Sequence, residues 1–169
     1  RGYYGAEKNM VKYFLYMAYY PVLVSGPIVR YGDFKPYLDE KDISRENIWE
    51  GIERFILGLG KKVILANNFS KLGEFKGLEQ STLMSWLMLV AFSLELYFDF
   101  SGYSDMALGL SSIMGIRLKK NFDFPFSSKS IGEFWRRWHM SLGSWFRDYI
   151  YIPLGGNRRG KARWTFNLL

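Results

Sequence analysis

The chain has 169 residues, no cysteine and one histidine, and it carries a formal net charge of +7. These counts exclude a disulfide, a cysteine nucleophile, a cysteine metal site and a zinc site built on several histidines. Hydrophobic residues make up 49% of the chain and aromatic residues 19%, a composition that indicates a membrane protein rather than a simple soluble domain.

The first apolar stretch covers residues 10–29 and carries one charge near its start. About 20 apolar residues in a helix are long enough to cross the hydrocarbon core of a membrane. Pro21 and the Ser-Gly-Pro run at 25–27 are expected to kink or end that helix. The charged and polar residues 30–47 predict a surface loop, at the end of which Ser44 would cap the next helix.

Residues 48–67 repeat apolar side chains at helical spacing, which predicts an amphipathic helix. Its charged positions place this helix either in the membrane interface or inside a larger bundle. Residues 69–80 follow as a polar, glycine-bearing loop.

Residues 82–101 are predicted as a transmembrane helix, since only Glu95 and Asp99 interrupt the apolar run. These two carboxylates are four positions apart and share a helix face. They either face the protein interior or a wet cavity, or they lie at the membrane edge, and both interpretations stay open. After Gly102, residues 103–118 are too short to span and are rich in small residues that allow close helix contact.

Residues 121–130 are predicted as a loop because they combine asparagine, proline and serine. Ser130 and Glu133 form a capping-box pattern, so one helix is expected to start there and run up to Pro153. An aromatic and apolar stripe follows one side of that helix: Phe134, Trp138, Leu142, Trp145 and Tyr149. The basic segment 157–163 is predicted as a cytoplasmic loop in preference to a phosphate site.

His139 is the sharpest candidate for chemistry, because it is the only imidazole and lies in an apolar, aromatic and arginine-bearing segment. In such a setting an imidazole tends to be neutral and can accept a proton from a hydroxyl. The alternative is a buried structural histidine bonded to a backbone group, and the residues alone favour this alternative.

The carboxylates Glu95, Asp99 and Asp105 could form a pair for sugar chemistry, but their apolar setting argues against it. A structural ion pair is preferred, in which Asp99 or Asp105 meets an arginine near the histidine: Arg136, Arg137 or Arg147. Nucleic-acid binding is not favoured, because the aromatic residues lie on long apolar stripes and not on alternating strand faces.

Three segments carry a family resemblance: SGPIVRYGDF at 25–34, YFDFSGYSDMALGL at 97–110, and NFDFPFSSKSIGEFWRRWHMSLGSWFRDYIYIPLGGNR at 121–158. Together they resemble the membrane-bound O-acyltransferase (MBOAT) family, and within it the bacterial polysaccharide branch that takes part in alginate O-acetylation. Proteins of teichoic-acid D-alanylation share the FDFSGYS-like and FWRRWHxSL-like stretches, whereas PLGGNRRGKAR favours the acetylating branch.

The resemblance implies an all-α, polytopic helical protein of the bacterial cytoplasmic membrane, with transmembrane and re-entrant or interfacial helices around a tunnel. Through the tunnel an acyl group would reach a hydroxyl acceptor. His139 maps onto the first of two polar positions of the family and would have a supporting role. Residues 1–169 are then expected to be a partial domain that lacks an N-terminal part and a C-terminal part with the second, catalytic histidine. Alone it would be inactive.

The resemblance also implies the surroundings of the site. The residues expected to wall the tunnel or orient the site are Trp135, Arg136, Trp138, Arg147, Asp148, Asp99 and Asp105. The donor would be acetyl-CoA or another acetyl thioester, which a dry tunnel protects from hydrolysis, with no bound cofactor and no metal. Expected partners are membrane lipid, extracytoplasmic acetyltransferase proteins and the polysaccharide acceptor, but no nucleic acid. The alternatives are D-alanyl transfer to teichoic acid, or a transporter or structural membrane protein.

Overall fold

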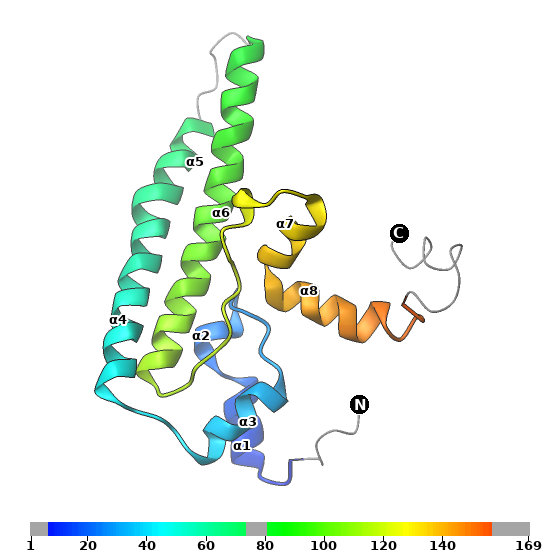
Figure 1. Cartoon of the computed structure of the whole chain (residues 1–169). Helices are drawn as coiled ribbons and strands as arrows, with labels where there is room; N and C mark the ends of the chain where they lie inside the picture. The colour runs from blue at the N-terminus through cyan, green and yellow to red at the C-terminus, as the bar shows by residue number, and fades with distance from the viewer. Residues whose placement is uncertain (1–6, 74–80, 157–169) are drawn as a thin grey trace. The chain divides into compact units, whose positions relative to one another are not determined.

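The computed structural model describes residues 7–73 and 81–156, and within them all regular structure is helical (Figure 1). The expected all-α class is therefore confirmed for those residues. The chain divides into two compact units, Arg1–Lys120 and Asn121–Leu169. The first unit contains helices α1 to α6, and the second contains α7 and α8.

Two short helices take the place of a continuous span in the first apolar stretch. α1 covers Met10–Met17, and α2 covers Tyr20–Leu23 with Pro21 in its first turn. Proline is tolerated in the first turn of a helix but not in its interior, so a helix that contains Pro21 has to begin next to it. The expected break is confirmed, and neither piece alone is long enough to cross a membrane.

A third helix, α3 at Tyr31–Asp39, lies where the sequence predicts a surface loop. That prediction is wrong because Phe34 is buried in a cluster with Tyr19 and Ile116, which gives the segment an apolar face. Pro36 lies inside the helix without ending it. The proline and the charges of this segment are therefore poor guides to its structure.

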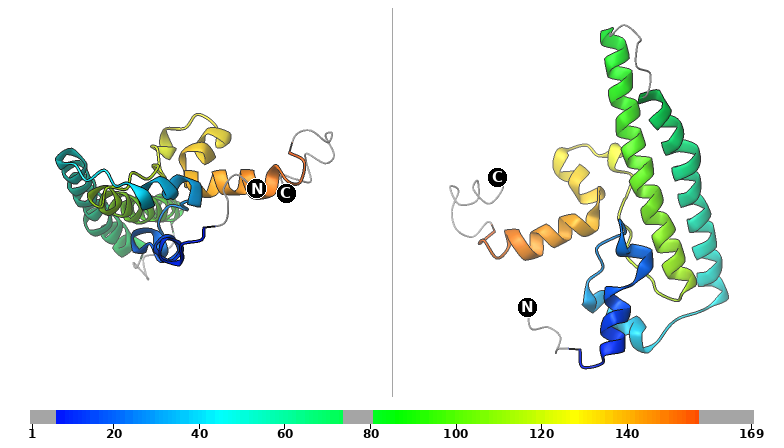
Figure 2. Two further views of the ribbon diagram at one scale, coloured as in Figure 1. Left: turned by 90° about the horizontal axis from the view of Figure 1, so that it is seen from below. Right: turned by 180° about the vertical axis from the view of Figure 1, so that it is seen from behind.

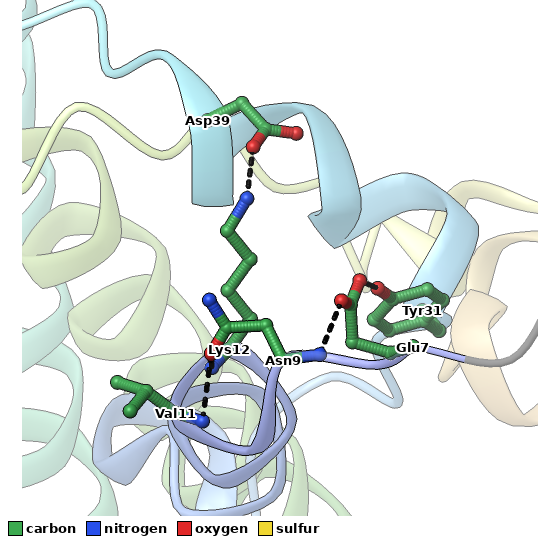
Figure 3. Close-up of polar contacts among 6 residues, drawn as sticks. All are labelled: Glu7, Asn9, Val11, Lys12, Tyr31 and Asp39. Carbon is green, nitrogen blue, oxygen red and sulfur yellow. Dashed lines mark hydrogen bonds and ion pairs between the residues drawn. The ribbon is translucent and has the colours of Figure 1, made fainter.

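Figure 3 shows the polar contacts that join the start of α1 to α3. The Glu7 carboxylate accepts a hydrogen bond from the backbone N–H of Asn9 at 3.0 Å. It also accepts one from the Tyr31 hydroxyl, and this bond raises the pKa of Tyr31 to about 12. Lys12 pairs with Asp39, and Asn9 caps the first turn of α1. These contacts hold the two short helices together at the surface.

A long helical run follows: α4 at Arg45–Gly60, the π-helical turn η1 at Lys61–Ala66, and α5 at Asn67–Gly73. The Ser44 hydroxyl accepts a hydrogen bond from the backbone N–H of Asn47 at 3.2 Å, which confirms the predicted cap. The predicted helix at 48–67 is confirmed and extends beyond both limits. The predicted loop at 69–80 is wrong for residues 69–73, which are helical, and residues 74–80 lie outside the described residues.

α6 covers Thr82–Ile113 and is the one helix among the described residues that is long and apolar enough to cross a membrane. At 1.5 Å per residue it is about 48 Å long, against about 30 Å of hydrocarbon. The predicted helix at 82–101 is confirmed, but it continues through Gly102, so the predicted separation there is wrong. Large apolar side chains are exposed along its first half: Leu83, Trp86, Leu87, Leu89, Val90, Phe92 and Leu96.

Paired glycines allow α4 and α6 to pack closely side by side (Figure 1 and Figure 2). A Cβ atom on Gly58 would lie 2.6 Å from the carbonyl oxygen of Gly102, and one on Gly109 would lie 2.6 Å from that of Gly51. Both distances are too short for a real Cβ contact, so only glycine fits these positions. Small residues at such contacts are typical of helix packing in membranes. Gly102 is therefore a residue inside α6 at which α4 packs closely against it.

The second unit contains a 3₁₀ turn, η2 at Pro125–Ser127, followed by α7 at Ile131–Arg137, α8 at Met140–Phe146 and the π-helical turn η3 at Arg147–Tyr151. The Ser130 hydroxyl accepts a hydrogen bond from the backbone N–H of Glu133 at 3.2 Å, which confirms the predicted start of α7. The Glu133 carboxylate accepts from the backbone N–H of Lys129 at 2.9 Å and from Arg137 at 2.7 Å. The pKa of Glu133 is lowered, chiefly by the hydrogen bond from the Lys129 backbone N–H.

Candidate functional site

The helix that the sequence predicts from Ser130 onward is interrupted at His139. α7 ends at Arg137 and α8 begins at Met140. Between them His139 has a φ of +42°, in the left-handed region that few residues other than glycine adopt. The prediction of one continuous helix with an unbroken aromatic stripe is therefore wrong. A non-glycine residue in this region costs about 1–3 kcal/mol, persists only where its surroundings hold it, and is often found at functional sites.

Asn121 supplies the contacts that hold this break. Its side-chain oxygen accepts hydrogen bonds from His139 Nδ1 at 3.1 Å, from the Ser141 backbone N–H at 3.1 Å and from the Ser141 hydroxyl at 2.9 Å. Its backbone oxygen accepts from the Met140 N–H at 2.8 Å. Asn121 is 1% exposed, so these donors meet it away from solvent. An asparagine distant in sequence thus caps α8 in place of the residue that precedes the helix.

The imidazole of His139 is half-buried and lies parallel to the ring of Phe122, with ring centroids 6.4 Å apart. Burial lowers the pKa of His139, because a partly desolvated imidazole is harder to charge. The ring is therefore neutral near pH 7. A neutral imidazole has one donor and one acceptor nitrogen, which suits it to orient a hydroxyl group or accept its proton.

Trp138 belongs to the same aromatic cluster as His139. Its ring meets Phe122 edge-on, with centroids 5.1 Å apart, and stacks on Phe134, with centroids 5.6 Å apart. Phe122 therefore lies against both Trp138 and His139. The structure thus brings together two of the residues predicted for the site and adds a phenylalanine that the sequence analysis did not single out.

The other predicted site residues of the second unit differ in their exposure to solvent. Trp135 is 60% exposed and Arg136 is also exposed, so neither closes a wall within this unit by itself. Arg147 and Asp148 lie in η3 and pair with each other, with Nε and Oδ1 3.3 Å apart. Their roles in walling or orienting a site stay predictions.

Two carboxylates of α6, Asp99 and Asp105, pair with cations of the first unit. Asp105 accepts hydrogen bonds from Arg54 Nε at 3.0 Å and from Lys61 Nζ at 2.6 Å, and Asp99 pairs with Lys62. The sequence instead assigns them to arginines of the second unit: Arg136, Arg137 and Arg147. The packing of α4 and η1 against α6 gives both carboxylates cations of their own unit, and a pairing with the second unit stays a prediction. Their part in a substrate site stays a prediction.

Sequence reasoning missed Asn121, the residue that organises this site. Asparagine favours positions where its side chain bonds to backbone groups, and this is the one local signal that the loop offered. The histidine that it contacts is 18 residues away, and no periodic pattern links the two positions. The basic segment at 157–163 lies outside the described residues.

A family model described as MBOAT, membrane-bound O-acyltransferase family, matches residues 6–169. The probable alginate O-acetylase AlgI of Pseudomonas putida is 43% identical over 164 residues, which are 96% of this chain and 33% of that protein. The peptidoglycan O-acetyltransferase of Helicobacter pylori is 38% identical over 156 residues, 89% of this chain and 30% of that protein. The teichoic acid D-alanyltransferase of Bacillus subtilis is 36% identical over 144 residues, which are 81% of this chain and 36% of that protein. The chain spans about a third of the length of these relatives.

Proposed function

The chain belongs to the membrane-bound O-acyltransferase family, and from this premise we propose that it forms part of an enzyme that O-acetylates an exported, alginate-like polysaccharide. The likeness to an alginate O-acetylase over nearly the whole chain is the observation that carries the proposal. A second support is His139, a half-buried imidazole in an aromatic setting whose pKa is lowered by burial. Such a group suits a site that handles a hydroxyl.

In the proposed reaction an acceptor hydroxyl attacks the carbonyl carbon of an acetyl thioester, with acetyl-CoA as the donor. The carbon–oxygen bond forms, the carbon–sulfur bond breaks, and the hydroxyl proton leaves through a base, so that an ester and a free thiol result. His139 has a supporting role, in which its acceptor nitrogen orients the hydroxyl. We propose that the part of the enzyme outside these 169 residues supplies the principal base, since the chain spans about a third of its relatives.

The setting follows from the same proposal. The enzyme is a multi-pass protein of the bacterial cytoplasmic membrane, which α6 crosses, while α7 and α8 lie in the interface or re-enter the membrane. Trp135, Arg136 and Arg147 wall or orient the tunnel of the assembled protein. Membrane lipid, extracytoplasmic acetyltransferase proteins and the polysaccharide are the partners. Acetyl-CoA enters as a substrate and is not a resident cofactor.

D-alanyl transfer to teichoic acid is the second candidate, favoured by the likeness to the Bacillus subtilis D-alanyltransferase. The two reactions share an acyl thioester and a hydroxyl acceptor, so His139 would act in the same way in both. They differ in the acyl group and in the carrier that delivers it. A requirement for a D-alanyl carrier protein would therefore favour the second candidate over acetyl transfer.

The test uses membranes that contain the full-length protein and its proposed extracytoplasmic acetyltransferase partners, with radiolabelled acetyl-CoA and a polysaccharide acceptor. We expect label in the polysaccharide with the wild type, and at least about 100-fold less with His139→Ala at equal amounts of folded protein. Detergent size-exclusion chromatography measures the folded amount. Unchanged transfer with His139→Ala would remove this histidine from the mechanism. Transfer from a D-alanyl carrier alone would favour the second candidate, and no transfer from either donor would refute acyl transfer.

A further inference from the structure

The geometry points to Asn121 as a positioning residue for His139. Its side-chain oxygen holds the imidazole in the tautomer that carries hydrogen on Nδ1, and so presents Nε2 as the acceptor nitrogen toward the hydroxyl that is acylated. This inference rests on the proposed acyl transfer. It adds to that proposal a residue from the loop before α7, outside the helices that flank the histidine.

The identity of the Asn121 atom that faces His139 follows from a third group. The same Asn121 atom lies 3.1 Å from the backbone nitrogen of Ser141. A backbone N–H can only donate, so the atom that faces it has to be the amide oxygen and not the amide nitrogen. The orientation of the Asn121 amide is thereby fixed, although oxygen and nitrogen of an amide are often hard to tell apart.

The tautomer of His139 follows in turn. Nδ1 lies 3.1 Å from the Asn121 oxygen, and an amide oxygen only accepts hydrogen bonds. Nδ1 therefore carries the hydrogen, and in a neutral ring Nε2 carries the lone pair. Burial lowers the pKa of His139 and favours this neutral ring near pH 7. Nε2 is then the ring nitrogen that can accept a hydrogen bond or a proton from a substrate hydroxyl.

The contact also resists rearrangement. A half-turn of the imidazole would bring a ring carbon in place of Nδ1 and lose the bond to Asn121, whose oxygen is buried from water. Two backbone hydrogen bonds also join the two segments. The Met140 N–H donates to the backbone oxygen of Asn121 at 2.8 Å, and the Asp123 N–H donates to the backbone oxygen of Arg137 at 2.9 Å. Loop and helix break thus act together to hold one orientation of the ring.

Charged groups near the break bear on a pH test. The charged side chains on the segments around His139 are Asp123, Lys129, Glu133, Arg136, Arg137, Arg147 and Asp148. Arg137 pairs with Glu133, and Arg147 pairs with Asp148. Burial is the cause of the lowered pKa of His139. A new carboxylate in contact with Nδ1 would therefore act against that shift and raise the pKa.

Three variants of the full-length protein test the inference by the pH dependence of kcat/KM and by kcat and KM separately. Asn121→Ala removes the acceptor, Asn121→Asp keeps an acceptor and adds a charge, and Ser130→Ala removes the cap of the neighbouring helix α7 without touching His139. We expect Asn121→Ala to lower kcat about 10- to 100-fold with little change in KM, because a misoriented group costs that much. Ser130→Ala should leave kcat unchanged for the folded fraction.

Asn121→Asp is the decisive variant. It should restore most of kcat and move the acid limb of the pH profile to higher pH, because the carboxylate favours the protonated imidazole. A purely structural cap would leave that limb where it is. The inference is overturned if Asn121→Asp leaves the profile unmoved while Asn121→Ala loses only as much activity as Ser130→Ala.

A second measurement is independent of acyl transfer. In ¹⁵N-histidine-labelled full-length protein, with His139→Gln to assign the signal, the ring nitrogens report the tautomer directly. We expect Nδ1–H in the wild type and its loss in Asn121→Ala. An Nε2–H ring in the wild type would overturn the inference even in an active enzyme. Absence of transfer from any donor, with the expected tautomer observed, would instead count against the proposed function and leave the geometry of the pair supported.

Discussion

Replacing Gly58 with alanine is expected to force α4 and α6 apart, whereas the same change at Gly60 should be tolerated. A Cβ atom at position 58 would lie 2.6 Å from the carbonyl oxygen of Gly102 and 2.7 Å from the backbone nitrogen of Met106. A Cβ atom at position 60 meets nothing within 4 Å. The two glycines are neighbours on one helical run, so the pair separates packing from backbone propensity.

The size of the effect follows from these distances. Ordinary contact begins at 3.4 Å, so the new methyl group at position 58 is 0.8 Å too close (3.4 − 2.6) to a backbone atom that cannot rotate away. Overpacking of this kind costs about 1–3 kcal/mol. Alanine in place of glycine in a helix returns about 0.5–1 kcal/mol at both positions. We therefore expect Gly58→Ala to be about 1–3 kcal/mol less stable than Gly60→Ala.

The assay is the melting temperature of the full-length protein in detergent, measured by size-exclusion chromatography after heating. Each kcal/mol shifts Tm by about 1 °C in a protein three times the length of this chain, so Gly58→Ala should melt about 1–3 °C below Gly60→Ala. Gly109→Ala, whose Cβ would lie 2.6 Å from the Gly51 carbonyl oxygen, should behave like Gly58→Ala. Equal melting temperatures for Gly58→Ala and Gly60→Ala would refute the close packing of these helices.

Asp105→Asn should cost about 1–3 kcal/mol, because two cations share that carboxylate, whereas Asp99→Asn at a more exposed pair should cost about 0–1 kcal/mol. Equal losses in the heating assay would contradict this ranking. Below about pH 6.5, the wild type should lose stability relative to His139→Gln, because burial lowers the pKa of His139 and the unfolded state takes up the proton first. Parallel Tm curves between pH 7.5 and 5.5 would contradict that expectation.

The elements that the sequence predicted well are those with local signals. Ser44 and Ser130 both cap helices as their positions indicate, since a cap depends on residues three positions apart. The helix over the long apolar run in α6 was also predictable, because the residues of the run themselves indicate it. Family membership was predictable from motifs of the same local kind.

The errors in the fold arise where packing overrides a local signal. Pro36 and its charged neighbours indicate a loop, but burial of Phe34 against Tyr19 favours α3. Gly102 indicates a helix end, but the approach of α4 makes it a contact point within α6. In each case the deciding partner lies on another helix, and one sequence without its fold does not identify that partner.

The helix break at His139 likewise depends on a partner distant in sequence. A comparison of the backbone strain with the hydrogen-bond energies explains why the break persists. A left-handed histidine costs about 1–3 kcal/mol relative to a helical one. Against this, Asn121 accepts four hydrogen bonds from the segment 139–141, each worth about 0.5–1.5 kcal/mol net. The side-chain oxygen has two lone pairs for its three donors, so the contacts amount to about three full bonds, or about 1.5–4.5 kcal/mol, which is enough to offset the strain. Without Asn121 the local sequence, capped at Ser130 and free of proline until position 153, would favour a continuous helix and a different direction for the imidazole. The orientation of His139 is therefore a property of two segments, and substitutions in the loop should affect the histidine as strongly as substitutions beside it.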